Sequence, residues 1–334
     1  MKKEKRSKKL VLTGITSSGK PHLGNYISVI KPAIDLSKKK DFEVNIFIAD
    51  YHSLTKVWDK EKRKQYINEV TATLLALDLD INKVTFYKQS DIPEIMEVNW
   101  IITSMTSKGL LNRSHAYKEV LKNKDLAVSK MNMGLFNYPI LMAADIISFN
   151  AEQVLVGKDQ LQHLEITRNI IRRFKHIYKD EILNIPEALI NPNCTIIPGL
   201  DGKKMSKSYG NTIPIFSSNK SLKNLIMKIV TGSKNNEKEG IENCTIFKLY
   251  KSFSSNLEEY ESFFKTYKDG KNWKEAKQDL FEKIEKSLKV SFDKYTYFIE
   301  NTKVMEKFLK EGACKARNKS KKILTNMKQQ IGIL

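Results

Sequence analysis

The segment KLVLTGITSSGKPHLGN, residues 9–25, changes character twice within its length. Its first part, KLVLTGIT (9–16), is an apolar run that indicates a buried strand. Small and polar residues follow, and a helical pattern begins at about residue 22. A strand joined to a helix through a short loop is the building unit of an α/β fold.

The same alternation continues through the first half of the chain. Further strands are predicted for EVNIFIAD (43–50), KVTFYKQ (83–89) and QVLVG (153–157). Helical patterns occupy residues 60–77, about 93–106, 136–150 and 159–174. Such alternation predicts a parallel sheet, whose ligands lie at the carboxyl ends of the strands. We therefore expect a site in the loops that follow residues 15 and 50.

The composition changes near residue 215, after which the chain is rich in lysine and mostly helical in pattern. We predict the α/β class, with a Rossmann-like parallel sheet in residues 1–216 and a helical C-terminal domain in residues 217–334. The last helix is expected to return to the first domain.

The net charge of +20 over 334 residues favours a polyanionic partner, because lysine and arginine release counterions when they neutralise phosphates. Alternatively, a chain rich in Lys, Asn and Ile spreads this charge over solvated faces. No apolar run approaches the roughly 20 residues that span a bilayer, and the basic start is followed by too short an apolar stretch for a secretory signal.

The three cysteines, Cys194, Cys244 and Cys314, lie far apart. They fit neither a disulfide framework nor a C-x-x-C metal site, so we expect a reducing cytoplasm. The five histidines are also scattered, without an H-E-x-x-H motif, and no metal held by the protein is predicted.

Residues 14–21, GITSSGKP, match a Walker A loop except at the last position. A P-loop needs a hydroxyl there for magnesium and a backbone N–H for phosphate, and Pro21 has neither. Read with the following residues, GITSSGKPHLGN (14–25) resembles the signature of class I aminoacyl-tRNA synthetases. In that interpretation ATP approaches the small-residue loop, and His22, Gly24 and Asn25 open a helix whose N-terminus favours phosphates.

A second motif, GKKMSKSYGN (202–211), contains an intact K-M-S-K-S at 204–208. Two lysines three positions apart in a loop flanked by glycines can neutralise the charge that develops on a leaving pyrophosphate. The alternative is a solvated lysine run. An intact five-residue motif about 180 positions after the first motif favours the synthetase class instead.

A third region, residues 137–174, is similar to the tryptophanyl-tRNA synthetase pattern, as are LLNRSHAYKE (110–119) and GACKARNKS (312–320). The resemblance runs in order from about residue 11 to residue 330. On a helix Tyr138, Met142 and Asp145 share one face. A carboxylate near a helix C-terminus opposes the dipole, and an indole N–H is a natural partner for it. The alternative is an ordinary amphipathic helix with one acid.

The resemblance implies the following residues. ATP is expected at Thr16, Ser17, Ser18, Gly24, Asn25, Gly157, Lys158, Asp159, Ile197, Lys204, Met205, Ser206, Lys207 and Ser208. The catalytic residues among and beside these are Lys204, Lys207, Ser206, His22 and Thr16. Tryptophan is expected at Asp145, Tyr138, Met142, His52, Gln160, Val154 and Val156; for His52 a surface turn is the alternative.

Three departures from the family pattern stand out. Thr16-Ser17 replaces a common Gln-Pro, and Lys158 replaces an acid, which reverses a charge beside ATP. Some relatives hold an iron–sulfur cluster on four cysteines, which three dispersed cysteines do not provide.

The implied activity is tryptophan activation with ATP, followed by transfer of tryptophan to tRNA(Trp). Mg²⁺ is expected to be held mainly by the ATP phosphates, without protein metal ligands. The family implies a homodimer with tRNA crossing subunits and the anticodon arm on the C-terminal domain; neither DNA nor a membrane is an expected partner. The rivals are a tyrosyl-specific relative and a non-catalytic RNA-binding paralogue.

Overall fold

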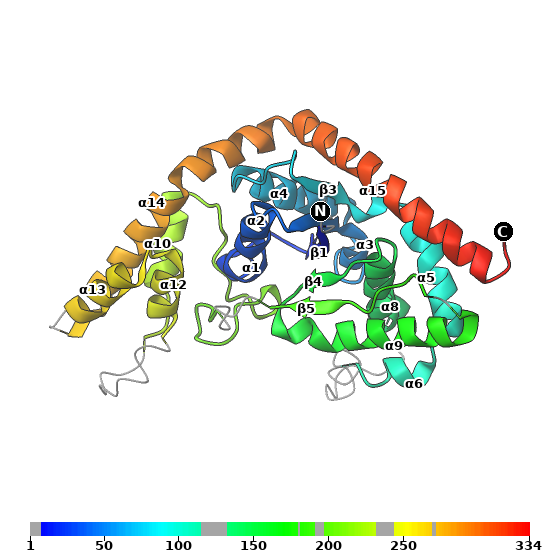
Figure 1. Cartoon of the computed structure of the whole chain (residues 1–334). Helices are drawn as coiled ribbons and strands as arrows, with labels where there is room; N and C mark the ends of the chain where they lie inside the picture. Colours follow the sequence, from blue (N-terminus) through cyan, green and yellow to red (C-terminus); the bar gives the residue numbers. More distant parts are fainter. Residues whose placement is uncertain (1–7, 115–131, 180, 191–196, 232–243, 269–271) are drawn as a thin grey trace, which may run out of the picture.

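A five-stranded parallel sheet forms the centre of the molecule (Figure 1). The computed structural model describes residues 8–114, 132–179, 181–190, 197–231, 244–268 and 272–334. The strands, in the spatial order β3-β2-β1-β4-β5, are β1 (Lys9–Thr16), β2 (Phe42–Ala49), β3 (Val84–Lys88), β4 (Gln153–Leu155) and β5 (Glu187–Leu189). The α/β class with a parallel, Rossmann-like sheet is confirmed.

Helices connect the strands. The first crossover contains α1 (Leu23–Asn25), a π-helical turn (Tyr26–Ile30) and α2 (Lys31–Ser37). The next helices are α3 (Asp50–Ser53), α4 (Lys60–Ala76), α5 (Glu94–Met105), α6 (Lys108–Leu111), α8 (Met133–Ile147) and α9 (Leu161–Tyr178). The C-terminal part contains α10 (Asn219–Met227), α12 (Thr245–Phe253), α13 (Leu257–Lys268), α14 (Trp273–Glu300) and α15 (Thr302–Gln330).

The strand order reverses direction at β1. Val11 lies opposite Val44 of β2 on one side and Gln153 of β4 on the other. In an open parallel sheet the crevice for ligands lies at this switch point, outside the carboxyl ends of the two strands. Those ends are Thr16 and Leu155, so the fold directs attention to the loops that follow them.

Alternating side chains of the strands feed two cores. Val11, Val44 and Ile46 pack on the side of α2 and α4, in a core that extends to α10, α12 and α14. Leu12 and Phe47 face α5, α8 and α9. A strand buried on both faces reads as a continuous apolar run, as the end of β2, residues 46–49, does. The sheet is thus a rigid middle layer, from which the loops project.

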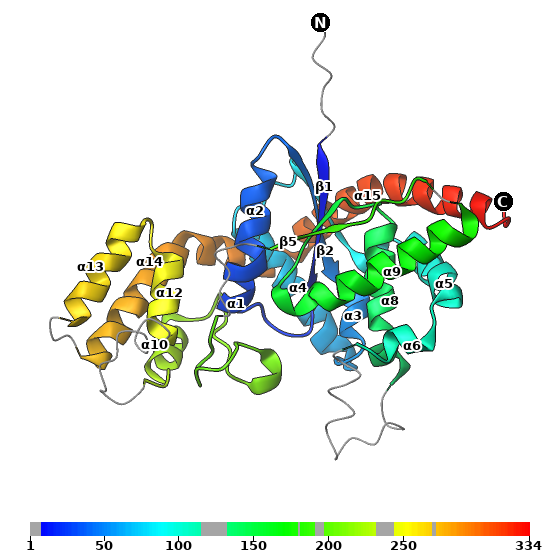
Figure 2. The same ribbon diagram turned by 60° about the horizontal axis from the view of Figure 1, so that its bottom comes forward.

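The C-terminal helices form an arm that leaves the sheet and then returns (Figures 1 and 2). A reciprocal capping pair starts α14: the Asn272 side chain accepts from the Glu275 N–H, and Glu275 accepts from the Asn272 N–H. At Asn301 the chain bends into α15, which runs back beside β3 and α5. Arg317 of α15 forms a two-pronged ion pair with the buried Glu94 of α5. Where the C-terminal domain begins stays a prediction.

The edge strand β3 is covered by α15 at a point of close approach. A Cβ atom on Gly312 would lie 1.7 Å from the carbonyl oxygen of Phe86. Helix backbone and strand backbone are therefore in direct contact, which only glycine permits. This contact also protects an edge that would otherwise be free to pair.

Some local structure differs from the expectations. The strand predicted at 153–157 ends at Leu155, and the short β5 was not predicted. The helix expected within 136–150 begins earlier, at Met133, because Asn132 caps it by accepting from the Leu135 N–H at 2.7 Å.

We predict that Gly312→Ala lowers the free energy of unfolding by about 2–4 kcal/mol, because the added methyl group forces α15 away from β3. Chemical denaturation measures the change. Gly109→Ala in α6 is the matched control, since nothing lies within 4 Å of its Cβ position and little change is expected. Equal stability of the two variants would contradict the close contact.

Candidate active site

The loop after β1 leads into a tightly capped helix. His22 is the N-cap of α1: its Nδ1 accepts from the Asn25 N–H at 3.3 Å, while its own N–H donates to Asn25 Oδ1 at 3.2 Å. Burial, followed by the nearby charges of Lys207 and Lys204, lowers the pKa of His22 to about 3. The imidazole is therefore neutral at physiological pH, and its contacts cap the start of α1.

The small residues of this loop differ in exposure. Thr16 and Lys20 are exposed, Ser18 is half-buried, and Ser17 is fully buried. Within the described ranges the Ser17 hydroxyl oxygen has no hydrogen-bond partner. A buried hydroxyl without a partner costs free energy, so its presence in a ligand loop is consistent with a role there.

The second loop, residues 197–211, is held by its own backbone and by Asn211. The Met205 N–H donates to the Ile197 carbonyl at 2.9 Å. Asn211 accepts from the Ser206 N–H at 2.8 Å and donates to Asp201 at 2.6 Å. Gly202 and Gly210 have φ values of +78° and +63°, which favour glycine. Asn211 was missed, although it stands directly after Gly210 in the quoted motif.

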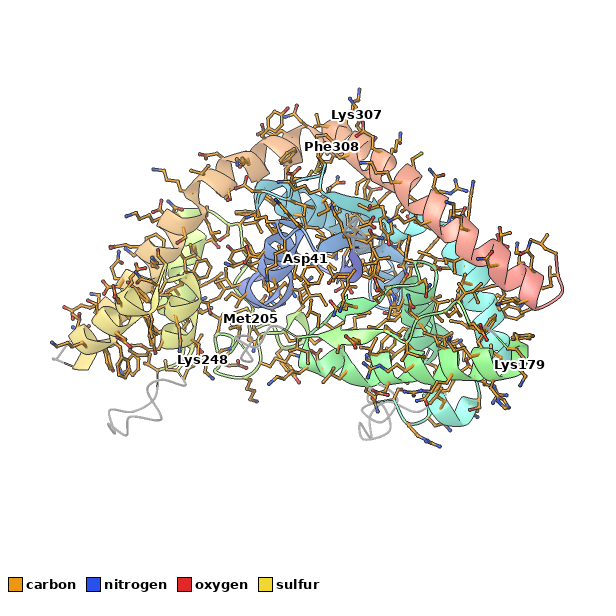
Figure 3. The ribbon with its side chains drawn as sticks, in the orientation of Figure 1. Asp41, Lys179, Met205, Lys248, Lys307 and Phe308 are labelled. Carbon is orange, nitrogen blue, oxygen red and sulfur yellow. The ribbon has the colours of Figure 1, made fainter. Side chains whose placement is uncertain are left out.

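The two loops meet along a short antiparallel contact. The Leu23 N–H donates to the Ile213 carbonyl at 2.9 Å, and the Ile215 N–H donates to the Pro21 carbonyl at 3.0 Å. The Gly24 N–H contacts the Met205 sulfur at 3.3 Å, which places Met205 beside α1 (Figure 3). The structure thus brings together motifs about 180 positions apart.

Lys207 reaches across to the first loop. Its Nζ donates to the Gly19 carbonyl at 2.7 Å, and the positive φ of Gly19, +146°, lets the backbone pass this close. Burial, with a smaller contribution from the charge of Lys56, lowers the pKa of Lys207 to about 8. Lys56 was not predicted; it follows the loop after β2.

The other lysine faces the turn after β4. Lys204 Nζ lies 3.2 Å from Asp159 Oδ2, and Asp159 also accepts from the Gln160 amide at 3.0 Å. Burial opposes the charge of Asp159, but the Gln160 hydrogen bond and the Lys204 charge outweigh it and hold the pKa below its ordinary value. A Cβ on Gly157 would lie 2.7 Å from Asp159 Oδ1, so a larger residue there would displace the Asp159 carboxylate. Lys158 is exposed.

The second group of predicted residues gathers around Asp145, which is 1% exposed. Its Oδ2 lies 2.9 Å from His52 Nε2, and its Oδ1 accepts from the Gln89 amide at 2.7 Å. Gln89 in turn accepts from the Tyr51 N–H at 3.1 Å. Burial raises the pKa of Asp145, and the hydrogen bonds from His52 and Gln89 limit the rise. Gln89 was missed; its position at the end of the third predicted strand was the available signal.

His163, also missed, connects two predicted residues. Its Nε2 hydrogen-bonds the Tyr138 hydroxyl, and its Nδ1 lies 3.0 Å from Gln160 Oε1. Tyr138 lies edge-on to His52, with ring centroids 6.4 Å apart. Met142, half-buried, belongs to the same apolar cluster as the buried Val154 and Val156. Helix α8 therefore carries both the buried carboxylate of Asp145 and an apolar side chain, Met142, of this cluster.

Comparison with known proteins places this arrangement in a family. The sequence profile of the tRNA synthetases class I (W and Y) matches residues 3–289. The chain belongs to this family. The tryptophan–tRNA ligase of Neisseria meningitidis is 43% identical over 98% of this chain and 98% of its own length. That of Bordetella parapertussis is 44% identical over 97% of this chain and 73% of its own length.

Solved structures of the class I synthetases agree. Tryptophanyl-tRNA synthetase from Campylobacter jejuni, complexed with ADP and tryptophan, is 40% identical, with a TM-score of 0.84 over 97% of this chain and 99% of that one. Tyrosyl-tRNA synthetase from Archaeoglobus fulgidus, at 19% identity and a TM-score of 0.66 over 89% of this chain, shares the fold. The roles of the individual residues stay predictions.

The described residues of this class I synthetase lack two further features, a metal site and a membrane-spanning helix. Within the described part of the chain, no three His, Cys, Asp or Glu side chains gather as a metal site. In the same residues, every helix is too short or too polar to cross a membrane.

We predict that the affinity for inorganic pyrophosphate depends on the charge of Lys207. Because its pKa is about 8, the amine loses its proton as the pH rises from 7 to 9. Relative to Lys207→Arg, which stays charged, the wild-type affinity should fall by up to about tenfold over this range. Calorimetric titration at each pH measures the ratio, with Lys203→Arg as control. A constant ratio would contradict the lowered pKa.

Proposed function

We propose that this chain is a tryptophan–tRNA ligase. It activates L-tryptophan with ATP to tryptophanyl-adenylate and pyrophosphate, and then transfers tryptophan to the 3′-terminal adenosine of tRNA(Trp). The observation that carries the proposal is the joint presence of the two interlocked lysine-bearing loops and the buried Asp145, in a chain 43% identical over nearly its full length to a tryptophan–tRNA ligase.

The first step needs no protein nucleophile. An oxygen of the tryptophan carboxylate attacks the α-phosphorus of ATP, and the bond from that phosphorus to the bridging oxygen of pyrophosphate breaks. Negative charge develops on the pyrophosphate, within reach of Lys204 and Lys207. Catalysis is then positioning plus charge stabilisation, in which both lysines act as fixed cations.

The nucleotide lies between the loop of Thr16–Asn25, the turn of Gly157–Asp159 and the loop of Ile197–Ser208. When bound, Mg²⁺ would be held mainly by the ATP phosphates and would add charge neutralisation there. Asp159, already paired with Lys204, keeps that lysine near the turn until phosphates replace the carboxylate.

Tryptophan lies against Asp145. The indole offers one N–H donor and no acceptor, and each carboxylate oxygen of Asp145 accepts one hydrogen bond while retaining a further lone pair. Tyr138, Met142, Val154 and Val156 supply apolar surface beside it, and Gln160 links this pocket to the nucleotide turn. Selection by hydrogen bond to a buried group discriminates strongly against analogues that lack the donor.

The tRNA is assigned to the basic C-terminal helices. We place the anticodon arm on residues 217–334 and propose a homodimer in which one tRNA contacts both copies. A net charge of +20 supports binding to a polyanion. A cytoplasmic location is part of the proposal, and Cys244 and Cys314 are unpaired thiols, as a reducing compartment would keep them.

We predict that Asp145→Asn raises KM for tryptophan by about ten- to a hundredfold in ATP–pyrophosphate exchange, with little change in KM for ATP. Asparagine retains the shape but removes the charge that strengthens the hydrogen bond to the indole. Asp293→Asn, an exposed aspartate of α14, is the control and should behave as the wild type. Exchange that runs equally well with tyrosine would overturn the tryptophan assignment.

If the chain were a non-catalytic RNA-binding paralogue, Lys204 and Lys207 would not contribute to adenylate formation. We expect Lys204→Ala combined with Lys207→Ala to reduce adenylate formation by at least about a hundredfold while the fold persists. Single-turnover adenylate formation, with circular dichroism as the check on folding, distinguishes the two. Unchanged adenylate formation would remove this loop from the mechanism.

A further inference from the structure

A buried carboxylate joins the first nucleotide loop to the C-terminal arm. Glu69 of α4 is 6% exposed. Its Oε1 lies 3.0 Å from Lys20 Nζ, in the loop before α1, and its Oε2 accepts a hydrogen bond from the Tyr295 hydroxyl of α14. One carboxylate thus ties together three segments that are far apart in the sequence.

Tyr295 makes a second contact with the other loop. Its ring lies 4.7 Å from the ring of Phe216, centroid to centroid, and Phe216 is buried. Phe216 directly follows Ile215, whose N–H donates to the Pro21 carbonyl. The Tyr295 hydroxyl therefore contacts Glu69, which pairs with Lys20 of the first loop. The Tyr295 ring contacts Phe216, in the segment that follows the second loop.

These contacts converge on three consecutive residues. The Gly19 carbonyl accepts from Lys207, the Lys20 side chain pairs with Glu69, and the Pro21 carbonyl accepts from Ile215. Each residue on the path from the small-residue loop to α1 is held by a different partner. Loss of the Lys20–Glu69 ion pair would leave the Lys20 side chain, which is 49% exposed, free to move in solvent.

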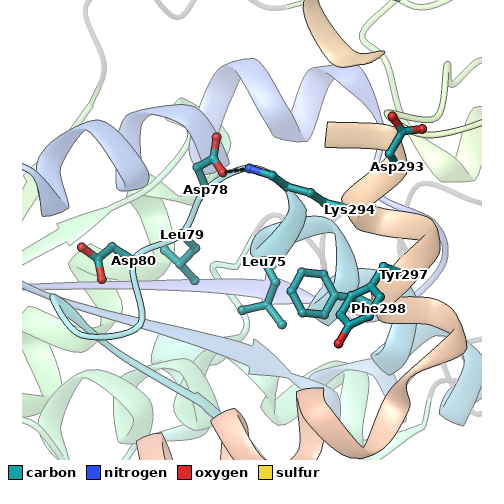
Figure 4. A pocket seen from close by; sticks show the side chains of 8 residues that line it. All are labelled: Leu75, Asp78, Leu79, Asp80, Asp293, Lys294, Tyr297 and Phe298. Carbon is teal, nitrogen blue, oxygen red and sulfur yellow. Dashed lines mark hydrogen bonds and ion pairs between the residues drawn. The ribbon is translucent and has the colours of Figure 1, made fainter. Parts of the chain in front are cut away.

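Two open hollows flank the contact between α4 and α14. A hollow of about 700 Å³ lies on one side of it, where Leu75 and Leu79 face Tyr297 and Phe298 and the Lys294–Asp78 ion pair spans the gap at 2.5 Å (Figure 4). A second hollow, of about 310 Å³, is lined in part by Glu69 itself. The Tyr295–Glu69 hydrogen bond therefore links α14 to α4 next to one of these hollows.

We propose that Glu69 and Tyr295 are positioning residues for ATP: through Lys20 and Phe216 they hold both nucleotide loops, so that the placement of α14 sets the affinity for ATP. The inference rests on the proposed function, because it connects the helices assigned to tRNA with the loops assigned to ATP. Burial and the hydrogen bond to Glu69 raise the pKa of Tyr295, which keeps its hydroxyl a donor over the whole working range of pH.

The experiment compares Glu69→Gln and Tyr295→Phe in the full-length chain, with Tyr297→Phe as the control. Tyr297 is also on α14 but 52% exposed, and Tyr295→Phe keeps the ring that contacts Phe216. We expect KM for ATP in pyrophosphate exchange to rise about tenfold in Glu69→Gln and about threefold in Tyr295→Phe, with KM for tryptophan and kcat nearly unchanged. Tyr297→Phe should match the wild type.

A double variant tests whether the residues act through one chain of contacts. If Lys20 is the route, Lys20→Met combined with Glu69→Gln should be no worse than the weaker-binding single variant. Unchanged KM for ATP in both single variants overturns the proposal. So does a parallel rise in both KM values that follows a fall in Tm, because that marks general destabilisation. If Glu69→Gln does not fold, Tyr295→Phe alone decides.

Direct calorimetric titration with ATP accompanies the exchange assay. Wild-type protein without tryptophan-dependent exchange would refute the proposed function, whereas the ATP affinities of the variants would still test the positioning role. Wild-type exchange with equal ATP affinity in all variants would refute the positioning role alone.

Discussion

The antiparallel contact between residues 21–23 and 213–215 is the constraint on which the site depends. Two backbone hydrogen bonds, from Leu23 to Ile213 and from Ile215 to Pro21, fix the loops relative to each other. Backbone bonds do not vary with side-chain rotamers, so the lysines that project from the second loop start from a defined platform. Lys207 then closes the frame by reaching Gly19. Without this contact, the two lysines would be flexible cations on a surface loop.

The sheet supplies the place for this frame, because its strand order reverses at β1. The first loop follows β1 and the Gly157–Asp159 turn follows β4, so both project from the same edge at the switch point. Asp145 approaches from α8, which covers one face of the sheet, and meets Gln89 at the end of β3. Different elements therefore position the two loops and the surroundings of Asp145. Under the proposed function, substitutions would be able to alter the affinity for ATP without altering the affinity for tryptophan.

Much of this was predictable from the sequence, for reasons that are local. Long apolar runs marked β1, β2 and β3, and the two lysine-loop motifs are contiguous stretches with few alternatives. Gln89, His163 and Glu69 were not found, because each acts through a partner between 25 and 56 positions away or, for Glu69 and Tyr295, 226 positions away. Gly312 was part of a quoted motif, yet its contact with Phe86 requires the three-dimensional path of α15. The sequence pattern therefore identifies the strands and helices, whereas only the packing of distant segments shows which residues contact each other.

Burial and nearby charges explain the lowered pKa values of His22 and Lys207. Lys204 and Lys207 face the same space as His22, and their charges add to burial in keeping the imidazole neutral. Lys207 itself is held below its usual pKa by burial and by Lys56. Under the proposed function, the phosphates of ATP would supply negative charge beside Lys204 and Lys207. Asp159 pairs with Lys204 at an exposed position, where phosphate oxygens would displace it. We therefore propose that the charges of these lysines favour the binding of an anion between the two loops.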